Sequence, residues 1–170
     1  MSLYQPVMDA LLALLQAGCG TNFKTYTRRL VTWEALAQQQ QTGSALIQQP
    51  YLCLFDGVIT ADSGVIKYER TARSVPAKRE MMKSIVVYAQ MPGSGTAAGP
   101  DSTTPGGDVF YPLLETIESA LEVTYDPTGT QTLGGLVFHC WIEGTAYMFT
   151  GDIDPSGQGM MIVPVRIMIP

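Results

Sequence analysis

The sequence predicts a single α+β domain spanning residues 1–170, with a mixed, mainly antiparallel β-sheet packed against two main α-helices. Three observations support this prediction. The length of 170 residues suits one domain with its own core. Hydrophobic residues make up 46% of the chain and charged residues only 15%, against about 25% charged in an ordinary domain. Finally, segments with helical and with strand periodicity follow one another in the order helix, strands, helix, strands.

The first element is a predicted helix over residues 3–17. Its apolar residues recur at spacings of three and four and form one stripe, Leu3, Val7, Leu11, Leu14 and Leu15. Gly18 and Gly20 then mark its end. A polar, partly exposed strand is expected over residues 23–31, and a short helix over 33–41 that runs into a glutamine tract.

Three strands and a long loop are predicted in the middle of the chain. Tyr51–Phe55 and Ser84–Gln90 are apolar and indicate buried strands, whereas residues 65–73 are more polar. Met91–Gly107 contains five glycines and three prolines and is interpreted as a surface loop. A loop of this length without secondary structure is usually functional or disordered.

A second helix and three strands are expected in the C-terminal part. Asp108 is the predicted N-cap of a helix over residues 109–121, in which Pro112 is tolerated in the first turn. Strands follow over residues 136–143, 145–150 and 160–169, and Gly144 is expected to reverse the chain as a hairpin. Pro164 has no backbone N–H to donate to a neighbouring strand, so the last strand is predicted to lie at an edge or to be locally irregular.

The charge is acidic overall and divides unevenly along the chain. A formal net charge of −5 argues against a general nucleic-acid-binding module. Residues 1–85 hold nine basic against six acidic residues, a net of +3, whereas residues 86–170 hold Arg166 against nine acids, a net of −8. Two interpretations remain open: the halves interleave in space, or a basic flank meets the acidic flank of a neighbouring subunit in a head-to-tail ring.

These charges supply the candidate subunit-interface or lumen residues. They are Arg28, Arg29, Arg70, Arg73, Lys78, Arg79, Lys83, Glu115, Glu118 and Glu122. A solvated loop or helix face is the alternative for each group. The loop at 91–107 is the candidate docking segment, represented by Met91, Gly95, Asp101 and Gly107.

No catalytic residue, metal or cofactor is predicted. His139 is the only histidine and lies in an expected strand, without a nucleophile signature elsewhere. The three cysteines form no CxxC motif and are expected to be reduced, buried thiols of a cytosolic protein. Asp152–Gly157 resembles the start of a calcium loop, but position twelve is Val163 rather than the bidentate glutamate. The apolar stretch near the N-terminus is too short to span a membrane.

Several landmarks along the chain together resemble one known family. The C-terminal ones are the runs 131–137, 141–144 and 163–170, which read QTLGGLV, WIEG and VPVRIMIP. The upstream ones are the leucine-rich first helix, Phe23-Lys24-Thr25 with Arg28-Arg29, Trp33, Pro50-Tyr51-Leu52 and the helix Leu113–Leu121. With these landmarks the chain is similar to the tail terminator (tail completion) proteins of long-tailed bacteriophages. The region Gln38–Gln49 is longer than the family pattern.

The resemblance implies a small α+β subunit that forms a ring, usually a hexamer. The ring would cap the finished tail tube, end its polymerisation and provide the surface on which the head docks. Its implied partners are copies of itself, the tail tube protein and the head–tail connector protein, with DNA passing through the lumen without specific binding. The implied location is the virion tail, with assembly in the host cytoplasm. Another neck or head–tail joining protein is the alternative, and a hydrolase that uses His139 is a third hypothesis.

Overall fold

The computed structural model describes residues 4–32, 35, 48–56, 58–59, 66–67, 79–91, 107–122, 128–149 and 158–170. These residues form an α+β fold, as the sequence predicts. The helices are α1 (Tyr4–Cys19), the short 3₁₀-helix η1 (Gly20–Asn22) and α3 (Gly107–Glu122). The strands are β1 (Thr25–Thr27), β2 (Tyr51–Phe55), β3 (Val58–Ile59), β4 (Ile66–Lys67), β5 (Arg79–Gln90), β6 (His139–Ile142), β7 (Tyr147–Phe149) and β8 (Gln158–Ile169).

Six strands form one mixed sheet in the order β1-β2-β5-β8-β6, with β7 also paired to β8. Only the β1–β2 pair is parallel among the pairs of this sheet, and the others are antiparallel. The centre of the sheet is the long β5–β8 pair, whose register runs from Arg79 opposite Ile169 to Gln90 opposite Gln158. β3 and β4 form a separate two-stranded antiparallel pair.

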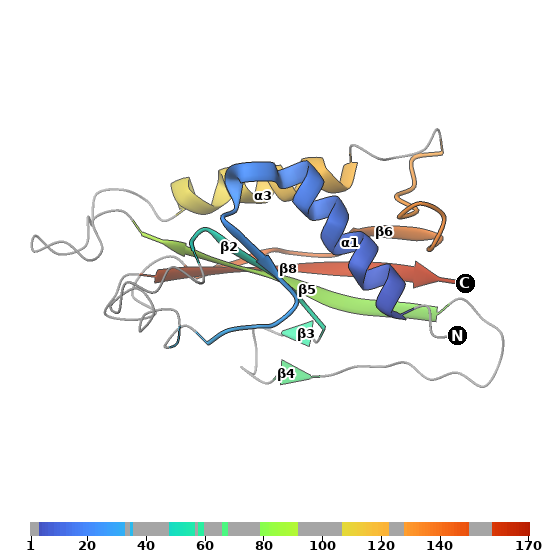
Figure 1. Cartoon of the computed structure of the whole chain (residues 1–170), viewed down its shortest axis with the longest axis horizontal. Coiled ribbons are helices and arrows are strands. Elements are labelled where there is room, and N and C mark those ends of the chain that lie inside the picture. The colour runs from blue at the N-terminus through green and yellow to red at the C-terminus, as the bar shows by residue number, and fades with distance from the viewer. Residues whose placement is uncertain are drawn as a thin grey trace, which may run out of the picture.

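Both α1 and α3 lie on one face of the sheet (Figure 1). The spacing of apolar residues explains this placement, because the buried side chains of α1 and α3 fall on one stripe of each helix. Alternate residues of the strands complete this main core, for example Leu52, Ile85 and Val163. The opposite sheet face has a smaller cluster, which consists of Tyr51, Cys53, Phe55, Val86 and Tyr88. The two predicted main helices are therefore confirmed, and their apolar stripes hold them on the sheet.

A glycine allows the two helices to approach closely. A Cβ built on Gly18 of α1 would lie 2.5 Å from the Cβ of Ala120 and 2.8 Å from its Cα on α3. Real Cβ atoms do not approach a neighbouring backbone so closely. Gly18 was expected only to end the first helix, but α1 continues to Cys19. Its role in the structure is the contact between α1 and α3.

The prediction of a hairpin at Gly144 is wrong. β6 and β7 do not pair with each other but follow one another along the same edge of β8, with Ile142 opposite Val165 and Tyr147 opposite Ile162. Between these two pairs, the four residues 143–146 lie opposite only two residues of β8, 163 and 164. The edge strand is therefore interrupted by a bulge. Gly144 has a φ of +85°, a backbone conformation that glycine adopts without strain. The glycine therefore shapes a bulge rather than a chain reversal.

Pro164 lies opposite this bulge, inside the sheet. β8 pairs with β5 on one side and with β6 and β7 on the other, so it is not an edge strand as one alternative predicted. The Pro164 carbonyl accepts a hydrogen bond from Glu143 N–H at 3.0 Å, which places the polar groups of Pro164 on the bulged side. The position without an N–H therefore coincides with the interruption of the hydrogen bonds between β8 and the edge strands. The prediction that the strand is locally irregular at Pro164 is thus correct.

Other boundaries differ from the expected ones. α3 begins at Gly107, so Asp108 lies in its first turn and is not the N-cap. The described strands β1 and β6 are shorter than the predicted segments 23–31 and 136–143, and β5 begins five residues before the predicted Ser84. The predicted helix over 33–41 lies outside the described residues except for residue 35, and so do most of 65–73 and the whole of 152–157.

Candidate interaction surfaces

The outer face of α3 is acidic. The buried residues Phe110, Leu113, Ile117 and Leu121 place the opposite side of the helix in solvent. The exposed stripe of this side, at spacings of three and four, consists of Asp108, Tyr111, Glu115, Glu118 and Glu122. The three glutamates predicted as interface candidates therefore share one accessible surface, which we call the α3 face.

Tyr111 belongs to this face and was not predicted as an interface residue. Its side chain is 58% exposed, the largest value among the exposed large hydrophobic residues of the described chain. Tyr111 precedes Glu115 by one helical turn, so the aromatic ring and the carboxylates lie on one stripe. The periodicity of α3 was enough to find it, because Tyr111 falls outside the apolar stripe.

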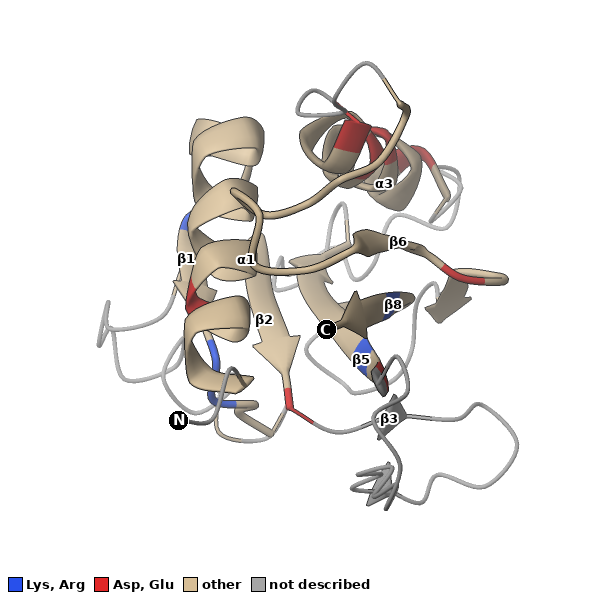
Figure 2. Cartoon of the chain, turned by 90° about the vertical axis from the view of Figure 1, so that its right-hand side faces the viewer, with Lys and Arg blue, Asp and Glu red and all other residues tan. Residues whose placement is uncertain are grey.

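A basic flank surrounds β1 on the other side of the molecule. Lys24 and Arg29 are exposed on either side of Thr25–Thr27. The backbone N–H of Lys24 donates to the Pro50 carbonyl at 2.8 Å, and that of Arg29 donates to the Thr27 hydroxyl at 3.0 Å. Figure 2 shows the acidic residues of α3 on one side and the basic residues near β1 on the opposite side. We call Lys24 and Arg29 the β1 flank.

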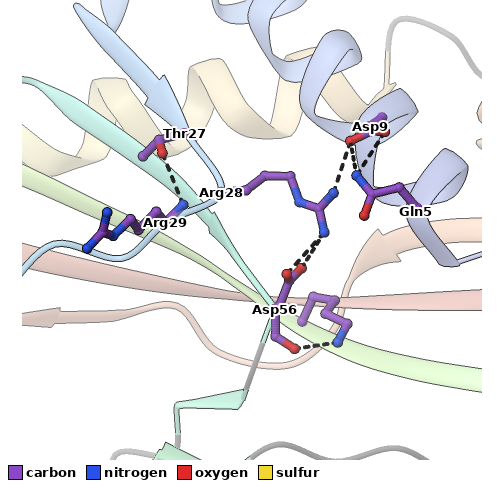
Figure 3. A network of polar contacts seen from close by, with 7 residues as sticks. Gln5, Asp9, Thr27, Arg28, Arg29 and Asp56 are labelled. Carbon is purple, nitrogen blue, oxygen red and sulfur yellow. Dashed lines mark hydrogen bonds and ion pairs between the residues drawn. The ribbon is translucent and has the colours of Figure 1, made fainter.

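Arg28 lies next to Arg29 but uses its charge within the chain. Its guanidinium lies 2.9 Å from an oxygen of Asp9 on α1 and 2.9 Å from an oxygen of Asp56 after β2. Burial opposes the charge of Arg28, but hydrogen bonds and attraction from Asp56 and Asp9 outweigh burial and raise its pKa. In Figure 3, Arg28 points toward these carboxylates and Arg29 points away from them. Of the two neighbouring arginines, Arg29 is the one that reaches solvent.

Lys83 is also buried inside the chain. Only 3% of it is exposed, because it alternates on β5 with Ile85 and faces the helices. Its ammonium donates to the Asp56 backbone carbonyl and lies 4.9 Å from the centre of the Tyr4 ring. Burial lowers the pKa of Lys83, although the nearby Asp56 carboxylate opposes that shift. Lys83 and Arg28 join α1 to the ends of β2 and β5, so neither is placed at an exposed interface.

The other predicted interface residues are placed only in part. Arg79 is the first residue of β5, and Arg70, Arg73 and Lys78 lie outside the described residues. In the candidate docking loop, Gly95 and Asp101 lie outside them as well. Met91 is 8% exposed and packs in the main core directly after β5. Gly107 is the first residue of α3, so the two described ends of the loop belong to the packed fold.

His139 is part of an aromatic and charged cluster that spans neighbouring strands of the sheet. Its Nδ1 accepts a hydrogen bond from the Gln131 N–H at 3.1 Å, and its ring stacks on Trp141 with 4.6 Å between ring centres. Trp141 Nε1 donates to Glu143, and Arg166 lies 3.1 Å from Glu143 and 3.5 Å from Glu80. Local sequence patterns do not predict this cluster, since its members come from β5, β6, β8 and the residue that follows β6.

The cysteines are buried thiols, as the sequence predicts. Cys19, Cys53 and Cys140 are free and inaccessible. Burial raises the pKa of Cys19 and Cys53 to about 11 and that of Cys140 to about 12. Within the described ranges there is no group of three or more His, Cys, Asp or Glu side chains suited to hold a metal ion.

The sheet edge carries further exposed aromatic residues. Tyr147 and Phe149 of β7 are 43% and 39% exposed, and Phe138, just before β6, is 47% exposed. Tyr147 lies opposite Ile162 and Phe149 opposite Met160 on β8. These exposed aromatic side chains lie at the edge of the described sheet, on β7 and just before β6.

No model of a known protein family matches the chain, and no curated protein matches its sequence.

Of the helices in the described ranges, none combines the length and the hydropathy needed to cross a membrane.

Proposed function

We propose that the chain is a structural subunit of a bacteriophage virion that forms a ring at the end of the tail. The ring caps the tail tube, ends its polymerisation and offers the surface on which the head docks. Six subunits, contacts with the tail tube protein and the head–tail connector protein, and a lumen for DNA are parts of this proposal. It is based on the resemblance of the landmark segments to tail terminator proteins.

One structural observation carries the proposal furthest. Exposed acidic residues on α3 and exposed basic residues near β1 lie on opposite sides of the subunit (Figure 2). A ring requires a contact between two different surfaces of the same chain, repeated around an axis. Opposite charges on the two surfaces favour that contact and oppose pairing of like surfaces. The charge arrangement thus supports head-to-tail association.

The overall charge is compatible with the proposed lumen. A subunit with a formal net charge of −5 repels the DNA backbone at long range. A ring of such subunits lets DNA pass without binding it tightly. No bond-making step is required for this role, and the contacts of His139 with Gln131 and Trp141 give it a structural task within the fold.

Locating the chain in the virion tests the proposal. Tails of the encoding phage are purified and labelled with an antibody against the chain, and the label is found by electron microscopy. We expect label at one end of the tube, and tubes of uncontrolled length when the gene is deleted. Normal virions without the gene product contradict the proposal. Label at the connector with normal tube length assigns the chain to the neck instead.

A further inference from the structure

The α3 face differs from an ordinary solvated helix surface. Exposed helices usually intersperse both signs of charge, with cations three or four residues from acids. α3 carries Asp108, Glu115, Glu118 and Glu122 and has no Lys, Arg or His anywhere along it. In the described part of the chain, no cation forms an ion pair with these four acids. The negative charges on this face are therefore not balanced by cations of the helix itself.

The position of Glu122 also conflicts with the helix dipole. Glu122 is the last residue of α3, and no basic residue lies in the last turn. The C-terminal end of a helix carries partial negative charge, so a carboxylate there is unfavourable and a cation is favourable. Residues that violate a local preference of this kind are often retained for function. A cation supplied from outside the chain would remove the conflict.

The β1 flank has the properties that the α3 face requires of a partner. Lys24 and Arg29 are exposed and basic. Figure 2 shows β1, which they flank, on the side of the subunit away from α3. Among the described residues, Asp9 and Asp56 form ion pairs with the neighbouring Arg28 and none with Arg29. On α3, Tyr111 adds an exposed aromatic ring to the same stripe, and tyrosine is enriched in protein interfaces.

We propose that the α3 face of one copy of this chain docks on the β1 flank of a second copy. This inference rests on the proposed ring and names the two surfaces that meet in it. Each copy then retains one unused surface, which receives the next copy in the same way. A symmetric α3–α3 contact is disfavoured because it sets at least three carboxylates of one helix against those of another.

Neutral variants of each surface provide the first test. E118Q/E122Q removes two negative charges from the α3 face, and K24Q/R29Q removes two positive charges from the β1 flank. Matched controls place the same charge changes on exposed positions of α1, as A13K/Q16K and A13E/Q16E. We expect both neutral variants to weaken self-association at least tenfold in sedimentation equilibrium at low salt, and the controls to change it less than threefold. Circular dichroism and thermal unfolding verify that all variants are folded.

Charge reversal gives the sharper test. E115K/E118K/E122K leaves Asp108 as the one acid of the α3 face, so this variant has two basic surfaces. K24E/R29E has two acidic ones, and each variant alone is therefore expected to remain monomeric. An equimolar mixture restores both contacts, because each surface then meets its opposite, and oligomers of alternating variants should form. Added salt should weaken these oligomers as it weakens those of the wild type.

The outcomes separate this inference from the proposed function. Wild-type oligomers that persist unchanged in both neutral variants, or reversed variants that fail to associate on mixing, overturn the α3–β1 contact and leave the ring intact. A wild-type chain that is monomeric at all concentrations and absent from purified tails overturns the ring and the contact together. Tenfold weakening by both neutral variants with rescue on mixing supports the contact.

Discussion

The Nη2 atom of Arg28 lies 2.9 Å from Oδ1 and 3.0 Å from Oδ2 of Asp56, while Nη1 of the same guanidinium contacts Asp9 at 2.9 Å. Arg28 thereby links the first helix to the end of β2. Its side chain is 18% exposed, so its contacts are partly shielded from solvent. The neighbouring Arg29 forms no such link in the described part of the chain. The two arginines therefore permit a matched comparison.

We expect Arg28→Met to lower the free energy of unfolding by about 1–2 kcal/mol, because Asp9 and Asp56 lose a charged partner and solvent screens part of the loss. Arg29→Met should change it by less than about 0.5 kcal/mol, as an exposed substitution does. Urea unfolding followed by circular dichroism measures both. Equal effects of the two substitutions would show that the Arg28 network does not hold α1 on the sheet.

Gly18→Ala tests the close approach of α1 and α3. Alanine in place of glycine usually stabilises a helix by about 1 kcal/mol. Here the added Cβ would collide with Ala120, so we expect the free energy of unfolding to fall by about 1–3 kcal/mol. Ala17→Gly is the control in the same turn, with an ordinary propensity loss of about 1 kcal/mol. A stabilised Gly18→Ala variant in thermal or urea unfolding contradicts this helix contact.

His139→Ala separates a structural role from a catalytic one. The substitution removes the acceptor of the Gln131 N–H and the ring that stacks on Trp141. We expect a loss of about 1–2 kcal/mol of unfolding free energy, with ring formation and particle assembly retained below the melting temperature. His139→Gln, which keeps an acceptor, should lose less. A turnover activity of the wild type that disappears in both variants would assign His139 to catalysis instead.

The buried thiols predict that stability falls in alkali. The pKa of Cys140 is raised to about 12 by burial, whereas the thiol of an unfolded chain has a pKa of about 8.5. At alkaline pH the native state therefore keeps a proton that the unfolded chain releases. The resulting contribution of Cys140 to the free energy of unfolding is complete below a pH of about 8.5 and is lost as the pH rises through about 12. Lys83 has the opposite tendency, because burial lowers its pKa.

Cys140→Ala isolates the thiol from the other groups. Urea unfolding at pH 7.5, 9 and 10.5 should show a steeper fall of the unfolding free energy for the wild type than for the variant, because only the wild type releases the Cys140 proton on unfolding. The variant is expected to be less stable at pH 7.5 because a buried sulfur is lost. Parallel pH curves for the two proteins refute the account of Cys140.

Local periodicity was sufficient to predict the two main helices and the central strands. The spacing of Leu11 and Leu15 on α1, and of Leu113 and Ile117 on α3, determines which side of each helix is buried. The apolar runs of β2 and β5 also predict burial on both sheet faces. These features depend on residues close in sequence, and they agree with the structure.

Features that depend on distant partners could not be predicted in this way. Gly144 is compatible with a hairpin and with a bulge, and only the pairing of both flanking strands with β8 distinguishes the two. The partners of Arg28 on α1 and after β2 are likewise set by the tertiary fold. Lys83 is different, because it continues the alternation of Ile85 and Val87, whose side chains lie on the helix-covered face of β5. This alternation can be read from the sequence, but the charge of Lys83 led to its prediction as an interface residue.

Negative-stain electron microscopy of the purified protein, viewed end on at low salt, tests the central claim most directly. The account predicts closed rings with an open lumen, each subunit contributing one α3 face and one β1 flank to its neighbours. Single compact particles at every concentration, together with a monomer mass in solution, would contradict it.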